Sequence, residues 1–557
     1  MTAGTAFWPR GRAGALRPAQ TGMGSLAAVA FALLVVFVAA PIVLVLAKGF
    51  LAADGTLTLA HYRRFLDSPR HLASIRNSLL LGLATTLLLT IIGFAFAFAL
   101  TRGPRRLRTP LRGIALLPLI APHYIFGISL IILGGRQGIV TQALGLESWT
   151  VYGWSGVILS QVLSFLPIAV IMIENVLRGL DSHLEDAARD LGAREIEVLR
   201  RVTLPLCAPG LLKAALLVFS LSIADFANPA LLGANLSFLA PNAYQIIMGE
   251  MNMALGSVPC ALLVLPCAAV FLIHHSWLKD KSFTTVGGRP VGTEPRPIPP
   301  LLNALILALC GVVAALIVAN FAVTAFGAVT VLAGVDNSLT LRHFLNREGV
   351  AALLTSLKVS LLVGLISTVA GNGLAYVLVR GRMIGRGTIE FLALAGFALP
   401  GTVLGIGYLM AFNAPPLPLT NGLAILVLVT VFHVLAVPLE LGCSRLVQIA
   451  PDLEEAAADL GAGAWVAYRR IILPLMAASF LNGFVYAFLY SMVSVSAPIL
   501  LISPGRILAS VYIFQMADLG LLGTACAVTV AMIGCVLLGF GALHVLDGAR
   551  RRLWRGA

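Results

Sequence analysis

Residues 184–193 read Leu-Glu-Asp-Ala-Ala-Arg-Asp-Leu-Gly-Ala, and residues 453–462 read Leu-Glu-Glu-Ala-Ala-Ala-Asp-Leu-Gly-Ala. Every residue of the second stretch lies 269 positions after its counterpart, as 453 follows 184. The spacing holds without a gap as far as Leu204-Pro205 and Leu473-Pro474. Two segments that keep one register over this length indicate an internal duplication, so we expect two halves built on one plan.

The sequence around both segments is apolar enough to lie in lipid. Hydrophobic residues make up 59% of the 557 residues and charged residues 11%, against roughly 45–50% and 25% in an ordinary soluble domain. A hydrocarbon core about 30 Å thick needs about 20 apolar residues per helix. Stretches of that kind predict twelve transmembrane helices, at residues 25–47, 78–100, 113–134, 152–173, 208–232, 255–277, 300–322, 353–379, 388–411, 421–443, 475–500 and 521–545.

A polar, proline-rich stretch divides these spans six and six. It runs from Lys279 to Pro300 and contains five prolines, which is typical of an extended linker. We therefore predict a first half at residues 1–277, a linker at 278–299 and a second half at 300–557. The expected fold class is an all-α membrane protein of about twelve transmembrane helices in two homologous six-helix halves.

Arginines gather in alternate loops, which explains the net charge of +14 without a nucleic-acid partner. Under the positive-inside rule these loops, the linker and both termini face the cytoplasm. One loop disagrees, because four arginines lie between the first two spans on the predicted outer side. The cytoplasmic clusters are Arg102, Arg105, Arg106, Arg108 and Arg112, then Arg380, Arg382 and Arg386, then Arg550, Arg551, Arg552 and Arg555; the exceptions are Arg63, Arg64, Arg70 and Arg76.

Each repeated segment is predicted to form a short helix that ends in a tight turn. Ser182 with Glu185 has the spacing of a capping box, and Asp452 with Glu455 can serve the same purpose. A glycine then permits the left-handed turn that ends each helix, Gly192 or Gly461. The helical spacing gives each helix one small apolar face, formed by Leu184, Ala187, Ala188 and Leu191 in the first and by Leu453, Ala456, Ala457 and Leu460 in the second.

A small apolar face at a membrane surface allows another protein surface to come close, which favours insertion into a groove of a soluble partner. The alternative is an amphipathic helix that lies on the lipid. Such a helix carries a large aromatic or leucine-rich face, and neither segment has one.

These residues resemble the permeases of bacterial ATP-binding-cassette importers, whose signature is Glu-Ala-Ala, three residues, Gly, nine residues and Ile-x-Leu-Pro. The second half matches throughout, and the first has Asp186 for Glu and Val202 for Ile. The resemblance implies a type I importer permease fold with two ATPase-coupling loops. Their implied coupling residues are Glu185, Asp186, Ala187, Ala188, Gly192, Leu204 and Pro205, and Glu454, Glu455, Ala456, Ala457, Gly461, Leu473 and Pro474.

The same resemblance implies partners and a location. The chain contains no Gly-x-x-x-x-Gly-Lys-Ser/Thr phosphate loop, so a separate pair of identical ATPase subunits is expected to use the ATP and Mg²⁺. The permease itself is then not an enzyme and binds no cofactor or metal. A periplasmic solute-binding protein is expected to deliver the substrate to a multi-pass protein of the bacterial inner membrane.

A charged residue at membrane depth is a candidate for the substrate pathway. Asp225 and Asn228 follow an apolar run and precede Pro229, while the second half has Ser494 and Ser496 with the uncharged Val495 as the counterpart of Asp225. Helices interrupted near proline often line a transport cavity. Structural hydrogen bonds to a neighbouring helix, or an interfacial position, are the alternatives.

Two fused halves resemble a group of importers for ferric iron, thiamine or 2-aminoethylphosphonate. Residues 408–413, 493–497 and 503–511 look most like the 2-aminoethylphosphonate branch, so this resemblance implies 2-aminoethylphosphonate as the expected substrate. Residues 224–229 are close to the ferric-iron branch, and ferric iron or thiamine is the alternative. A twelve-helix secondary transporter is the principal alternative of another class, but it has no need for the paired loops. A membrane-embedded enzyme would need convergent His, Asp or Cys residues, and these are scattered.

The arginine asymmetry predicts that both repeated loops face the cytoplasm. Single cysteines introduced by Ala193→Cys or Ala462→Cys, in a background without the seven native cysteines, should resist a membrane-impermeant thiol reagent added from outside. Labelling should appear once the membrane is opened. External labelling of either position in sealed cells would contradict this topology.

Overall fold

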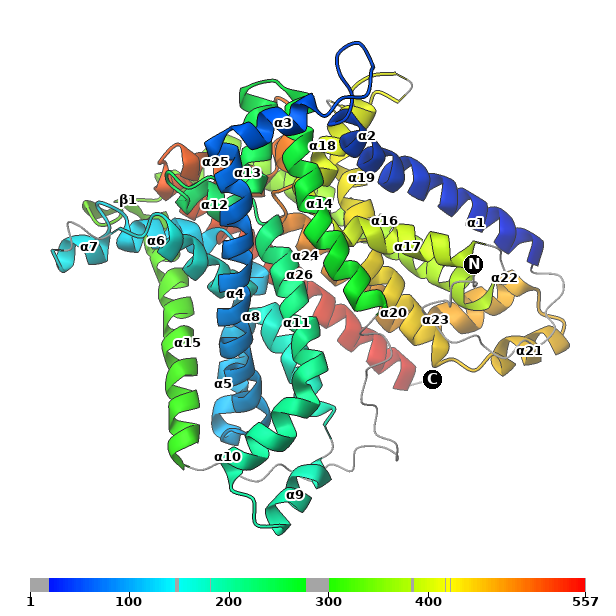
Figure 1. Ribbon diagram of the computed structural model, residues 1–557. Coiled ribbons are helices and arrows are strands. Elements are labelled where there is room, and N and C mark those ends of the chain that lie inside the picture. Colours follow the sequence, from blue (N-terminus) through cyan, green and yellow to red (C-terminus); the bar gives the residue numbers. More distant parts are fainter. Residues whose placement is uncertain are drawn as a thin grey trace. The chain divides into compact units, whose positions relative to one another are not determined.

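A computed structural model describes residues 20–145, 150–180, 182–276, 300–381, 385–415, 417–420 and 422–555 (Figure 1). This part is mainly helical and includes an antiparallel hairpin of β1 (Thr330–Leu332) and β2 (Asp336–Leu339). Nine of its helices are long and apolar enough to cross a membrane, or up to twelve if each of three bent pairs is one span. The predicted helical membrane fold is confirmed; the predicted linker lies outside the described residues.

The chain forms two compact units that do not coincide with the two linear halves. The α4 unit contains residues 61–346 and 513–533, and the α16 unit contains the described part of 1–60 with 347–512 and 534 onward. The first span of each half therefore belongs to the unit that holds most of the other half. The predicted division of the chain at residues 278–299 describes the sequence repeat and stays a prediction. The packing of the helices groups the spans into different units.

The α4 unit is built on α4 (Pro69–Arg102), which packs against α8 (Trp154–Arg178) and α11 (Leu204–Ala224). The long α15 (Pro300–Val329) runs beside α4 in Figure 1 and brings the start of the second half into this unit. Its Asn320 Oδ1 lies 2.5 Å from the buried Ser129 hydroxyl of α6. The other helices are α3 (Ala60–Asp67), α5 (Arg105–Leu116), η2 (Leu117–Ile120), α6 (Ile125–Gly134), α7 (Ile139–Ala143), α12 (Ala227–Leu232), α13 (Leu239–Tyr244), η4 (Gln245–Gly249), α14 (Met253–Ser276) and η5 (Arg342–Leu345).

The α16 unit repeats this core with α16 (Arg347–Arg380), α20 (Ala436–Val447) and α24 (Ala477–Val493). It takes its extra span from the N-terminal region, where the Tyr408 hydroxyl of α18 donates to the Phe37 carbonyl at 2.8 Å. The other elements are α1 (Gln20–Leu34), η1 (Val35–Ala39), α2 (Ala40–Lys48), α17 (Arg386–Ala398), α18 (Gly401–Phe412), α19 (Leu423–Val434), η7 (Pro498–Leu500), α25 (Ala509–Asp518) and α26 (Leu522–Arg555), the last two crossing the division.

The repeated loops stand at the ends of the two units (Figure 1). Short helices lead from each loop into a π-helical turn, followed at once by the Leu-Pro pair of the sequence repeat. Proline has no backbone N–H, so it cannot donate to the carbonyl four residues earlier as other helical residues do. In the turn before it, backbone hydrogen bonds span five residues, as from Leu204 N to Leu199 O. The elements are α9 (Ser182–Asp190), α10 (Glu195–Val198) and η3 (Leu199–Thr203), and α21 (Asp452–Asp459), α22 (Ala464–Ala467), η6 (Tyr468–Ile472) and α23 (Leu473–Leu475).

In both units a glycine lets the long helix approach its neighbour closely. A Cβ at Gly93 of α4 would lie 3.0 Å from the Ala169 Cβ of α8. At the corresponding point of α16, a Cβ at Gly371 would lie 2.7 Å from the Pro438 Cβ and 2.8 Å from the Leu439 backbone nitrogen of α20. These backbones therefore meet where glycine removes the side chain.

Gly371→Ala should weaken this contact by about 1 to 3 kcal/mol, because the added methyl group meets backbone atoms that cannot move aside. The expected result is a lower melting temperature of the purified protein in detergent. Gly373→Ala is the matched control, since a Cβ at this position of the same helix meets nothing within 4 Å. An equal melting temperature for both variants would contradict the close approach.

Candidate functional site

The first repeated loop folds as the sequence predicts, with a helix and a left-handed glycine. Gly192 has a φ of +86°, which a residue with a side chain adopts at a cost. The turn is closed by backbone bonds from Gly192 N to Arg189 O at 2.8 Å and from Ala193 N to Ala188 O at 3.0 Å. The chain then enters α10, whose start is capped by Glu197 accepting from the Arg194 N–H at 3.0 Å.

The second loop has the same geometry. Gly461 has a φ of +82°, and the bonds from Gly461 N to Ala458 O and from Ala462 N to Ala457 O are both 2.9 Å long. The two turns therefore agree bond for bond, as expected for a duplicated segment.

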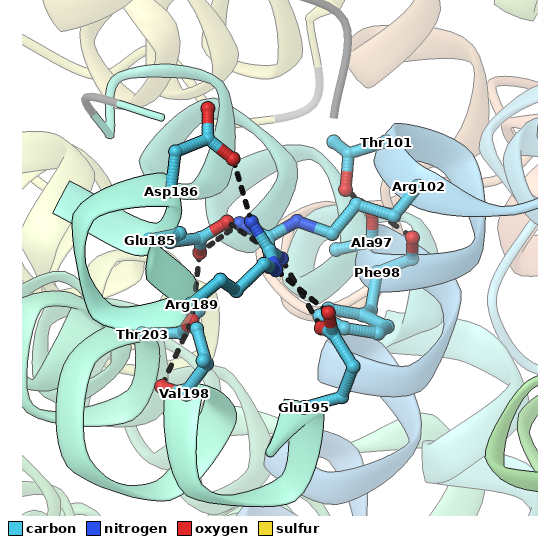
Figure 2. Close-up of polar contacts among 10 residues, drawn as sticks. All are labelled: Ala97, Phe98, Thr101, Arg102, Glu185, Asp186, Arg189, Glu195, Val198 and Thr203. Atoms are coloured by element: carbon cyan, nitrogen blue, oxygen red, sulfur yellow. Dashed lines mark hydrogen bonds and ion pairs between the residues drawn. The ribbon is translucent and has the colours of Figure 1, made fainter. Parts of the chain in front are cut away.

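Glu185 of α9 is buried, and two donors reach its Oε1 (Figure 2). The Arg102 guanidinium, at the last residue of α4, donates at 2.5 Å, and the Thr203 hydroxyl of η3 donates at 2.7 Å. The Arg102 guanidinium also lies 5.0 Å from the centre of the Phe98 ring. One carboxylate thus joins the loop helix to the end of the long spanning helix.

Arg189 adds a second set of ion pairs to the first loop (Figure 2). Its guanidinium donates to Glu195 at 2.6 and 3.1 Å and to Asp186 at 2.9 Å. The hydrogen bond to Glu195 raises the pKa of Arg189 most; burial opposes this, and the charges of Glu195, Glu185 and Asp186 support it. This set ties α9 to α10 and is missing from the second loop, where alanines occupy positions 458 and 464.

Glu454 of α21 is the buried carboxylate of the second loop. Arg380, the last residue of α16, donates to it at 2.7 Å, and the Tyr376 hydroxyl donates at 2.8 Å. Arg380 also donates to the Ile449 carbonyl just beyond α20, at 2.8 Å. The end of α16 is therefore bonded to both the loop helix and the span that precedes it.

The predicted apolar faces lie largely at the surface. Leu191 and Leu460 are each 89% exposed, and Leu184 and Leu453 are about half exposed. Of the four alanines, Ala187 and Ala456 are exposed, Ala188 is half-buried and Ala457 is buried. Two exposed apolar side chains extend these faces at corresponding positions, Ile196 and Trp465.

Sequence reasoning missed the role of the residues beneath the loops. Arg102 and Arg380 are expected from the sequence only as positive-inside charges, although each ends a 34-residue helix at the repeated point. The predicted cap at Asp452 is wrong, because α21 has Pro451 at its N-cap and no side-chain cap bond. In the first loop the Glu185 carboxylate accepts from Arg102 and Thr203. The Ser182 side chain lies outside what the structure describes.

The remaining predicted coupling residues lie close to these bonds. Asp186 and Glu455 are half-buried and follow the buried glutamates. Leu204-Pro205 and Leu473-Pro474 begin α11 and α23, directly after the π-helical turns. Their coupling role stays a prediction.

Asp225 lies between α11 and α12 and makes structural hydrogen bonds. Its Oδ2 accepts from Gln161 Nε2 at 3.0 Å and from Asn228 Nδ2 at 2.9 Å, and its Oδ1 accepts from the Ala227 N–H at 3.2 Å. These bonds hold the start of α12 against α8 and agree with the structural alternative. Asn228 Oδ1 is buried without a hydrogen-bond partner in the described part of the chain. A pathway role for either residue stays a prediction.

The structural counterpart of Asp225 is Ser494, not Val495. Asp225 ends α11 with a ψ of 122°, and Ser494, 269 positions later, ends α24 with a ψ of 134°. The Ser494 carbonyl accepts from the Ser510 hydroxyl at 2.6 Å. Ser496 is half-buried, with its Cβ close to Gly401. The helix therefore breaks at the same point in both copies, with a carboxylate in one and a hydroxyl in the other.

Comparison with known proteins agrees with this architecture. The family profile described as the inner membrane component of binding-protein-dependent transport systems matches residues 90–282, which include the first repeated loop. A protein named as a ferric transport system permease, FbpB 1 of Haemophilus influenzae, is 28% identical over 481 residues, covering 84% of this chain and 76% of the relative. The corresponding FbpB of Actinobacillus pleuropneumoniae is 28% identical over 470 residues, or 81% of this chain and 68% of the relative.

A third relative shows the family. The molybdenum transport system permease ModB of Mycobacterium tuberculosis is 31% identical over 205 residues, which are 37% of this chain and 72% of the relative. The relatives are transport permeases, and the chain has the helical membrane fold and the duplicated loops described above. The chain belongs to the family of inner membrane components of binding-protein-dependent transport systems, as a fused permease of an ATP-binding-cassette importer.

Proposed function

We propose that α9 and α21 are the two elements through which separate ATPase subunits drive this permease. The observation that carries the proposal is the duplicated loop, which presents small and apolar side chains outward. Alanine and leucine side chains on a short surface helix such as α9 or α21 can enter a groove of a partner protein and exclude water there. Two such helices suit a pair of identical ATPase subunits in the cytoplasm. Those subunits would bind the ATP and Mg²⁺, while this chain would bind no cofactor.

The proposed setting is the bacterial inner membrane, with both termini in the cytoplasm. A solute-binding protein would deliver substrate to the outer face. The arginine distribution supports this orientation through the positive-inside rule. Asp225, Asn228, Ser494 and Ser496 remain the proposed pathway residues, at the matching breaks after α11 and α24.

Two other readings of the loops explain less. A helix that lies on lipid should bury a broad apolar face there, yet α9 and α21 each carry an inward-facing, hydrogen-bonded carboxylate. A secondary transporter has no partner subunit that needs two matched surface helices. Both readings also leave the matched left-handed turns without a purpose.

For the substrate we propose ferric iron. The relatives that span 84% and 81% of this chain are named as ferric transport permeases, and residues 224–229 are close to the ferric branch. The 2-aminoethylphosphonate assignment rests on short segments of the second half and is not confirmed by these relatives. Thiamine rests on the fused architecture alone. The binding protein sets most of the specificity in such systems, so its ligand decides among the three.

Gly461→Asp and Gly192→Asp should each abolish coupling. Each places a side chain at a left-handed position, at a cost of about 1 kcal/mol or more, and puts a charge into the proposed ATPase groove. The expected result is normal protein level in the membrane with loss of uptake, while the ATPase is either released or hydrolyses ATP without transport. Copurification and uptake assays measure both effects.

Gly463→Ala is the matched control for the backbone. Gly463 has a φ of −65° and open space around its Cβ position, so uptake should stay at the parental rate. Parental uptake by both aspartate variants at normal protein level would show that these loops are not the coupling elements.

Calorimetry of the solute-binding protein encoded beside this permease tests the substrate. Titration with ferric citrate should give tight binding, whereas 2-aminoethylphosphonate and thiamine should give none. Tight phosphonate binding without ferric binding would move the assignment to the 2-aminoethylphosphonate branch.

A further inference from the structure

The long helices α4 and α16 both end in an arginine that is bonded to a loop glutamate. Arg102 and Glu185 are 83 residues apart in sequence, whereas Arg380 and Glu454 are 74 apart. The copies have therefore diverged in spacing but have kept the contact. A duplicated feature that survives such divergence is more than an accident of one loop.

Both pairs are shielded from water. The side chains of Arg102 and Glu185 are 9% and 3% exposed, and those of Arg380 and Glu454 are 12% and 7% exposed. Burial of an ion pair removes hydration that mutual attraction only partly replaces, so such a pair is weak evidence for stability alone. Its best-attested use is to hold two elements in one register.

Each carboxylate also keeps one hydroxyl donor, but from a different element. Glu185 accepts from Thr203, whose counterpart 269 positions later is Ile472, which has no hydroxyl. Glu454 accepts from Tyr376, one turn before Arg380, whereas Phe98 stands one turn before Arg102. The lost hydroxyl of η6 is thus replaced by a hydroxyl on α16. This exchange keeps one hydrogen-bonded guanidinium and one hydroxyl on each glutamate, and Arg189 lies farther from Glu185, at 3.9 Å from its Oε2.

The buried glutamate is the inward-facing polar residue of a helix whose other described side chains, apart from Ala457, are exposed or half-buried. Glu185 is the buried residue among positions 183–190 of α9, and α21 buries Glu454 and Ala457. The next carboxylate in each loop, Asp186 or Glu455, is half-buried and closer to the surface. One acidic residue therefore faces the membrane helices, and its neighbour is available to a partner.

We propose that Arg102–Glu185 and Arg380–Glu454 are the joints that transmit movement of the loop helices to α4 and α16. This inference rests on the proposed coupling function of α9 and α21. It adds the positioning residues that would connect these helices to the spanning helices. An ATPase that moves α9 or α21 pulls directly on the end of α4 or α16 through the charge pair. The second hydrogen bond of the glutamate comes from η3 in the first copy and from α16 in the second. Without the joint, the outward face can still dock, but its movement is not passed on.

The second copy provides the cleaner experiment, because Arg189 and Glu195 add further charges beside Glu185 in the first. The whole importer, with its ATPase and binding protein, is reconstituted in proteoliposomes, and uptake per ATP hydrolysed is measured. Glu454→Gln should lower this ratio at least tenfold while the ATPase still copurifies. The double variant Arg380→Glu with Glu454→Arg should restore at least half of the ratio that each single reversal loses.

The exchanged hydroxyl provides an independent test. Tyr376→Phe should lower uptake per ATP by several-fold, because Glu454 loses its second donor. Adding Ile472→Thr puts a hydroxyl where the first copy has Thr203 and should recover most of the loss. A role in folding alone would change the amount of protein rather than this ratio.

Glu174→Gln is the matched control for losing a buried carboxylate. Glu174 is 2% exposed and pairs with Arg178 of α8 at 2.7 Å and with Arg112 of α5 at 3.2 Å. Its loss should leave uptake per ATP at the parental value even if it lowers protein level.

The outcomes separate the joint from the proposed function. Parental ratios in Glu454→Gln and Glu185→Gln, with failure of the Gly192→Asp and Gly461→Asp variants, would overturn the joint alone. Parental uptake in all four would overturn the coupling function as well. Loss of protein in the glutamine variants and the double reversal would assign the pairs to folding and would also overturn the joint.

Discussion

A hydrocarbon interior offers no hydrogen bonds to a backbone, and this constraint governs the rest of the structure. Every peptide group within it must be satisfied inside its own helix or by a neighbour. The protein meets the requirement with long helices such as α4 and α16, each of 34 residues. Irregular backbone occurs at the matching breaks after α11 and α24, at the bends within three helix pairs and at the surface loops; at the first of these breaks Asp225 bonds the start of α12.

Close packing then connects the surface to the interior. Gly93 and Gly371 let the long helices touch α8 and α20 with little side chain between the backbones. The same long helices end in the arginines that hold the loop glutamates. Under the proposed coupling, a displacement of a loop helix would reach a closely packed pair of spans rather than a flexible connection. Close-packed interiors transmit strain because they have few voids to absorb it.

The duplicated copies show which chemistry is retained and which is free to vary. Both have the left-handed glycine, the buried glutamate and the arginine at the end of the long helix. They differ at Thr203 and Tyr376, which supply the same hydroxyl from different elements, and at Arg189, which only the first loop has. The loop glutamate keeps a hydroxyl donor in both copies although the donor comes from a different element. This indicates that the hydrogen-bonding geometry around the glutamate is maintained, rather than one particular donor residue.

Several features could be read from residue order because they depend on local spacing. The apolar spans, the turn glycines Gly192 and Gly461 and the duplicated register follow from periodicity, from the conformational freedom of glycine and from direct comparison of two stretches. The break near Asp225 also follows, since an interrupted apolar run beside proline is a local signal. The predicted cap at Asp452 failed because Pro451 lies at the N-cap position of α21 and no side chain caps that helix.

The sequence by itself therefore predicted twelve apolar spans, of which the described residues contain nine, or up to twelve if each bent pair is one span. It also predicted the duplication and the position of the two surface helices, because these features depend on local spacing and on direct comparison of two stretches. Only the tertiary structure decided that α15 packs in the α4 unit and the N-terminal span in the α16 unit, and that Arg102 and Arg380 bond Glu185 and Glu454. Those contacts join residues 74 or more positions apart. Many positively charged residues lie near the helix ends, and each of them fits the hydropathy pattern equally well. The packing of the helices decides which arginine reaches the carboxylate of Glu185 or Glu454.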